Sequence, residues 1–162
     1  MTIRNTRPEE IDILMELYES GKRIMRKSGN RKQWTGNYPP REMVVREIEA
    51  GNSYICLDEQ GKAVGTFAFI RGIDPTYLKI YDGAWLDDTL PYATIHRLAS
   101  TEESHGVADA VFNWCYAQVP NLRADTHRDN HILQHILTKQ GFRYCGIIYL
   151  LNGDERLAYQ KL

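Results

Sequence analysis

The second half of the chain alternates between segments with the apolar spacing of strands and segments with the apolar spacing of helices. This alternation constrains the fold most, because a helix that joins two neighbouring strands places them parallel in one sheet. Strands are expected at 92–99, 122–125, 142–150 and 156–160, and helices at 107–118 and 130–139. The order predicts a β-α-β unit set against a mostly antiparallel sheet.

The first half of the chain adds further elements to the same sheet. Apolar periodicity and Gly/Pro punctuation predict a strand at 3–5, helices at 11–25 and 43–48, a loop at 28–40, and strands at 53–57 and 64–70. We therefore predict an α+β (α/β) fold. Its core is a single mixed, mostly antiparallel sheet of six to seven strands with helices on both faces.

Length and composition are those of one globular domain. The chain has 162 residues, of which 43% are hydrophobic and 25% charged. No repeat, low-complexity tract or linker divides it, so a single domain over residues 1–162 is predicted. With 20 basic and 21 acidic residues the net charge is −1, which argues against nucleic acid as a partner because such binding needs a basic excess.

The apolar runs and the cysteines bear on the compartment. The longest apolar run, 144–151, is too short to span a bilayer, so no membrane partner is expected. The first residues carry charges where a signal peptide needs an apolar stretch. Cys56, Cys115 and Cys145 are odd in number and widely spaced, which is typical of reduced thiols. A cytoplasmic protein is predicted.

Small residues separate the expected strand at 92–99 from the helix at 107–118. Gly106 and Ala108 would let a ligand approach the first backbone N–H groups of the helix, and the helix dipole favours an anion there. The stretch is a candidate site for phosphate or pyrophosphate. The alternative is a tight turn whose small residues serve packing alone.

Two other stretches combine polar or aromatic residues with turn signals. Asp129 or Asn130 is expected to cap the helix at 130–139. Histidines recur every fourth residue from His127, but without an H-E-x-x-H motif or a carboxylate ligand no metal site is predicted. Trp34 and Tyr38 lie on the loop at 28–40, where they either form a wall over a ligand or pin the loop to the core.

These stretches, in this order, resemble the GNAT-type N-acetyltransferases, which use acetyl-CoA. The family's pyrophosphate motif, Gln/Arg-x-x-Gly-x-Gly/Ala, falls on 103–108, and its helix-opening Asn falls on Asn130. Trp-x-x-x-Tyr-Pro at 34–39, Ile-His-Arg at 95–97 and Asp-Thr-His-x-Asp-Asn at 125–130 resemble a bacterial small-molecule branch. The likeness covers nearly the whole chain.

The resemblance implies an acyltransferase that moves an acetyl group from acetyl-CoA directly to a primary amine of a small molecule, without a metal. The implied acetyl-CoA-binding residues are Leu98, Ala99, Ser104, His105, Gly106, Val107, Ala108 and Asn130. Loop position and resemblance together predict that the acceptor pocket is lined by Trp34, Tyr38, Tyr81 and Tyr92.

The chain departs from the family pattern at three positions. Glu103 stands where the family has Gln or Arg, and Asp109 adds a second acid beside the expected diphosphate. Leu137 stands where many members have the Tyr that protonates the departing thiolate. These departures favour an alternative of another class, a non-catalytic module on the same fold that binds acyl-CoA or another metabolite.

Catalysis without that Tyr is chemically reasonable, because a thiolate leaves with little proton assistance. The remaining task is to deprotonate the incoming ammonium, and His96 is the predicted base. His96 lies two residues before Leu98 on one expected strand, so both side chains are predicted on the same face. The alternative is a structural histidine bonded to a backbone carbonyl. The acceptor stays unidentified, and exposed strand edges leave a homodimer open.

Overall fold

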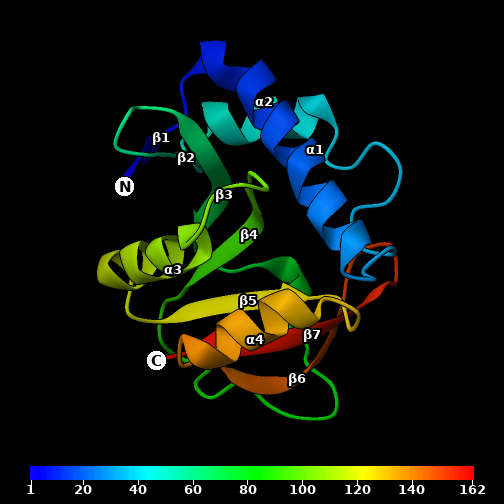
Figure 1. The fold of residues 1–162 in the computed structure, drawn as a ribbon. Coiled ribbons are helices and arrows are strands. Elements are labelled where there is room, and N and C mark those ends of the chain that lie inside the picture. Colours follow the sequence, from blue (N-terminus) through cyan, green and yellow to red (C-terminus); the bar gives the residue numbers. More distant parts are fainter.

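A seven-stranded sheet and four α-helices make up the fold of the computed structural model, which describes residues 1–162 (Figure 1). The strands are β1 (Thr2–Asn5), β2 (Ser53–Leu57), β3 (Ala63–Arg71), β4 (Ala93–Ser100), β5 (Leu122–Thr126), β6 (Arg143–Tyr149) and β7 (Glu155–Lys161). The helices are α1 (Ile11–Lys27), α2 (Arg41–Glu49), α3 (Val107–Gln118) and α4 (His131–Lys139). Every expected helix and strand is present, with ends within two residues of those predicted.

The strands follow the order β1-β2-β3-β4-β5-β7-β6, and every neighbouring pair is antiparallel except β4 and β5. These two pair in parallel only at Ala93–Leu122 and Thr94–Arg123, and then they separate. The prediction of a single mixed, mostly antiparallel sheet is confirmed. One side of β4 from Ile95 onward therefore has no strand partner, and this gap positions the site described below.

Helices cover both faces of the sheet, as predicted. On β2, Ile55 packs in a cluster with residues of α1 and α2, whereas the next residue, Cys56, packs with residues of α3 and α4. Successive side chains of a strand point to opposite faces, so the two helix pairs lie on opposite faces. None of the helices has the length and apolar character needed to cross a membrane.

Residues 72–92, which connect β3 to β4, cover the half of the sheet that the helices leave open opposite α4. Tyr77, a residue of the short 3₁₀ helix η2 (Pro75–Tyr77), packs against Ile148 of β6. The connection also hydrogen bonds to the edge of β6, because the backbones of Tyr81 and Ile147 exchange two N–H···O bonds of 2.8 Å. Part of this sheet edge is therefore already paired.

Gly83 lies where this connection approaches β6 most closely. A Cβ at position 83 would lie 1.9 Å from the carbonyl oxygen of Cys145. We expect Gly83→Ala to lower the free energy of unfolding by about 2–4 kcal/mol, because backbone has to move. Urea denaturation measures the loss.

Gly153→Ala is the matched control for Gly83→Ala. Unlike Gly83, Gly153 has a positive φ, of 91°, and an added Cβ there meets nothing within 4 Å. The control therefore carries only the left-handed backbone strain, roughly 1 kcal/mol. An equal loss in the two variants would contradict the close contact at Gly83.

Candidate functional site

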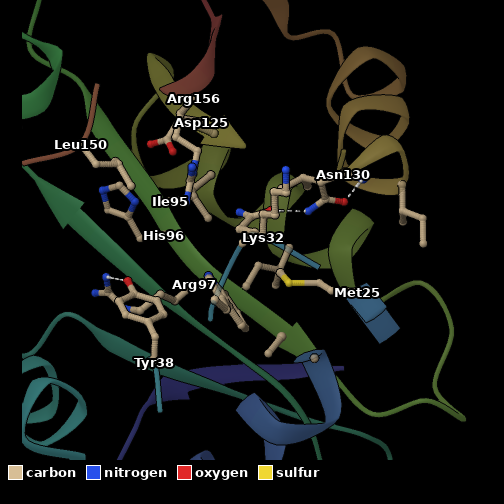
Figure 2. A pocket seen from close by; sticks show the side chains of 18 of the residues that line it. Met25, Lys32, Tyr38, Ile95, His96, Arg97, Asp125, Asn130, Leu150 and Arg156 are labelled. Carbon is tan, nitrogen blue, oxygen red and sulfur yellow. Dashed lines mark hydrogen bonds between the residues drawn. The ribbon is translucent and has the colours of Figure 1, made fainter. Parts of the chain in front are cut away.

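A cavity of about 600 Å³ opens where β4 and β5 separate. Its walls include residues of β4, β5 and β7, of α1 and the α1–α2 loop, and of the β3–β4 connection (Figure 2). The first turns of α3 and α4 and the turn between β6 and β7 complete them. The walls include seven of the residues predicted for the site: Trp34, Tyr38, His96, Leu98, Ala99, Ala108 and Asn130.

A β-bulge in β4 decides which side chains enter the cavity from that strand. Arg97 has a φ of 51°, and the register with β3 shifts between Thr66 and Ala68. Leu98 consequently packs against the α3 and α4 cluster, whereas His96 faces the opposite side, near Tyr77. The prediction that His96 and Leu98 share a face is wrong, because the bulge interrupts the alternation of side chains.

Arg97 links the bulge to the helical layer. Its Nη2 donates to Glu47 Oε1 at 2.5 Å, and its Nη1 donates to the Tyr38 hydroxyl at 3.5 Å. Tyr38 and Trp34 therefore form a wall of the cavity, and Trp34 also packs on Tyr18 of α1. Both alternatives for this loop hold at once, because the aromatic residues line the cavity and join the core.

His96 is held by Asp74, a residue that the sequence analysis did not select. His96 Nε2 lies 2.9 Å from Asp74 Oδ2, and both residues line the cavity. Asp74 Oδ1 accepts hydrogen bonds from the backbone N–H and the hydroxyl of Thr76, at 2.9 and 2.7 Å. The Asp-Pro-Thr order was a signal for this cap at the start of η2.

The pKa of Asp74 settles the direction of the bond to His96. Burial has the largest influence on this pKa and would raise it, but hydrogen bonds from His96 and Thr76 outweigh burial and lower the pKa to about 2. An ionised carboxylate can only accept, so the Nε2 of His96 carries a proton. In neutral His96 the free lone pair is therefore on Nδ1.

The low pKa of Asp74 predicts a loss of stability in acid. Ionised Asp74 stabilises the fold above its ordinary pKa of 3.8, and the contribution is lost as the pH falls towards about 2. We expect wild type to exceed Asp74→Asn in free energy of unfolding by about 2 kcal/mol at pH 5, with the difference shrinking below pH ~4. Urea denaturation at several pH values measures it, and a difference that stays constant with pH would contradict the assignment.

The end of β5 brings a second carboxylate to the cavity. Asp125 Oδ2 accepts a hydrogen bond of 2.5 Å from the hydroxyl of Tyr77, which is 1% exposed. Burial and the charge of Asp125 hold the pKa of Tyr77 well above its ordinary value, so its proton remains on the phenol. Figure 2 shows Asp125 beside Arg156 of β7, both near His96.

The first turn of α3 offers uncapped backbone N–H groups. Gly106 begins the helix with a φ of 75°, and no side chain caps it. Ala108 lines the cavity, while Ser104, His105, Gly106 and Val107 lie just before it in the chain and outside its walls. A helix start with free donors beside the cavity suits a phosphate or diphosphate group.

Neither of the two acids near this helix start binds its free N–H groups. Asp109 accepts a hydrogen bond of 2.7 Å from Gln140 and pairs with Lys139 at 3.3 Å. Glu103 is exposed and forms no ion pair. Neither carboxylate caps the uncapped N–H groups, so the helix start keeps its affinity for an anion.

Asn130 joins the start of α4 to the α1–α2 loop. Its Oδ1 accepts from the backbone N–H of Leu133 at 3.1 Å, which confirms the predicted cap. Its Nδ2 donates to Oε1 of Gln33 at 3.0 Å, and the same oxygen accepts from Asn30. Gln33, which no sequence signal indicated, therefore ties the two walls of the cavity together.

The structure does not bring Tyr81 or Tyr92 into the cavity, which corrects the prediction that they line the acceptor pocket. Tyr81 lies at the edge of β6 against Tyr149. Tyr92 is 8% exposed, stacks on Arg123, and accepts a hydrogen bond of 2.8 Å from the backbone N–H of Asp74. Both side chains pack where the β3–β4 connection contacts the sheet.

Three residues of α4 that the sequence analysis considered lie outside the cavity walls. Leu137 is fully buried in the core with residues of α3 and does not line the cavity. His131 and His135 are exposed on α4. No three His, Cys, Asp or Glu side chains lie close enough together to share a metal ion.

Comparison with solved structures identifies relatives over the full length of the chain. A GNAT-family acetyltransferase from Streptococcus agalactiae is 35% identical with a TM-score of 0.91, and the alignment covers 99% of this chain and 94% of that one. A GNAT-family acetyltransferase from Listeria monocytogenes is 18% identical with a TM-score of 0.71, over 99% and 93% of the two chains. The second likeness concerns the fold alone. Neither a protein-family model nor a curated protein matches the chain.

Proposed function

Since this chain belongs to the GNAT family of acetyltransferases, we propose that it transfers an acetyl group from acetyl-CoA directly to a primary amine of a small molecule. Acyl transfer is the activity of the family, and the chain is an acyltransferase. The observation that carries the finer proposal is the His96–Asp74 pair in the wall of the cavity between β4 and β5.

His96 is the proposed general base. Asp74 holds the Nε2–H, so Nδ1 is the atom that accepts a proton from the incoming ammonium. The neutral amine then forms a C–N bond to the thioester carbonyl while the C–S bond breaks, and the proton that the new amide nitrogen loses is taken up by the departing thiolate. The thiolate leaves with little need of an acid, which fits a buried, apolar Leu137 in place of a tyrosine.

Three parts of the chain are proposed to hold acetyl-CoA. The side of β4 without a strand partner, at Leu98 and Ala99, is free to hydrogen bond to the pantetheine amides. The uncapped start of α3, from Ser104 to Ala108, suits the diphosphate. Asn130 borders the cavity from the opposite side.

The cysteines support a cytoplasmic location as part of the proposal. Cys56, Cys115 and Cys145 are all buried and unpaired. Burial raises the pKa of Cys56 to about 12, so this thiol is unreactive near neutral pH. The edge strand β1 remains available for a homodimer.

Thiol release with a panel of amines tests the proposal, together with calorimetric titration of acetyl-CoA. We expect binding of acetyl-CoA and thiol release above the rate without amine. Binding without release by any amine would favour the non-catalytic acyl-CoA-binding module. Absence of binding would overturn both readings.

A further inference from the structure

Arg156 is a buried cation without an anionic partner. It is 7% exposed and lines the cavity. Its one hydrogen bond joins Nη1 to the backbone oxygen of Glu155 at 2.8 Å, and none of the ion pairs in the structure includes it. A guanidinium has five N–H donors, and burial without an anion is costly. The remaining donors of Arg156 are therefore free to bind a ligand in the cavity.

Asp125 is the complementary group. It accepts a hydrogen bond from the hydroxyl of Tyr77 and forms no ion pair, not even with Arg156 beside it (Figure 2). Asp125 pairs with Ala158 across β5 and β7, and Arg156 is two residues before Ala158, so both side chains project on one face. The cavity thus presents a carboxylate and a guanidinium side by side, near His96.

From this arrangement we propose that the amine acceptor is a free amino acid, whose carboxylate binds Arg156 and whose amino group binds beside Asp125 and His96. The inference rests on the proposed function and names its substrate class. A planar guanidinium matches a carboxylate through two parallel N–H···O bonds. An amine without a carboxylate would leave Arg156 without an anionic partner.

A carboxylate fits this place better than a phosphate. Arg156 is the one buried cation there that is free of an acidic partner, since Arg97 pairs with Glu47. Lys32, the other cation in the wall, is exposed. A single buried positive charge balances a singly charged group, whereas a phosphate dianion needs more.

The first experiment compares matched acceptors with wild-type enzyme at saturating acetyl-CoA. The acceptors are free amino acids, the carboxamides of the same amino acids, and the amines that remain after removal of the carboxyl group. We expect kcat/KM for the best free amino acid to exceed that for its carboxamide by about 10- to 100-fold, the effect of hydrogen bonds to a charged group.

The second experiment removes the cation. Arg156→Gln is expected to lower kcat/KM for the free amino acid by about 10- to 100-fold and to change that for the carboxamide by less than ~3-fold. Arg128→Gln is the matched control, because Arg128 is exposed and pairs with Glu155 on the surface. It should leave both acceptors unchanged, and calorimetric titration of acetyl-CoA verifies that each variant is folded.

Equal use of acid and carboxamide by wild type would overturn the inference, as would an equal fall for both in Arg156→Gln. If Arg156→Gln does not fold, the wild-type comparison decides, and Arg156→Lys is expected to retain part of the preference. Failure of the proposed function looks different, because no acceptor of any of the three kinds would then release thiol.

Discussion

Replacing His96 with alanine is expected to lower kcat by about 10²- to 10⁴-fold, the range typical of a lost general base. The reason is that the incoming amine would remain protonated without the Nδ1 lone pair that Asp74 leaves free. The Kd of acetyl-CoA should change by less than ~2-fold. Thiol release and calorimetric titration measure the two quantities separately.

Asp74→Asn separates positioning from general base catalysis. Asp74 orients the imidazole through one hydrogen bond, so its loss is expected to lower kcat less than the loss of His96. A kcat for Asp74→Asn as low as that of His96→Ala would contradict a positioning role for Asp74, and unchanged turnover in His96→Ala would refute the assignment of the base.

Placing a carboxylate at the start of α3 is expected to abolish most of the affinity for acetyl-CoA. Ala108 lines the cavity in the first turn of the helix. A negative charge about 5 Å from a diphosphate charge costs roughly 3 kcal/mol at an effective dielectric constant of ~20, or about 100-fold in Kd. Ala108 also packs against the core cluster, so circular dichroism checks that Ala108→Glu folds.

Ala110→Glu provides the matched control, because residue 110 lies in the same turn but outside the walls of the cavity. Its Kd for acetyl-CoA should stay within ~3-fold of wild type, since distance and solvent screen the added charge. Calorimetric titration measures both variants. Equal affinities for Ala108→Glu and wild type would mean that the diphosphate lies elsewhere, and the proposed binding role of residues 104–108 would then fail.

The candidate site was only partly predictable from local patterns. Asn130 and Gly106 were found because capping and left-handed turns depend on residues within a few positions in the chain. Asp74 was not predicted. It lies 22 residues before His96, and its contact with His96 depends on how the β3–β4 connection folds back onto the sheet. The same connection removed Tyr81 and Tyr92 from the predicted pocket by packing them on β6 and Arg123.

By itself, the sequence determined the order of the strands and helices, the mixed sheet, the capped start of α4 and the glycine turn before α3, because periodicity and turn chemistry act over short distances along the chain. Only the tertiary structure decided the bulge at Arg97, which turns His96 and Leu98 to opposite faces. It also decided that Arg156 and Asp125 lie side by side without pairing. Strand register and the separation of β4 from β5 arise from contacts between distant segments, which no local pattern encodes.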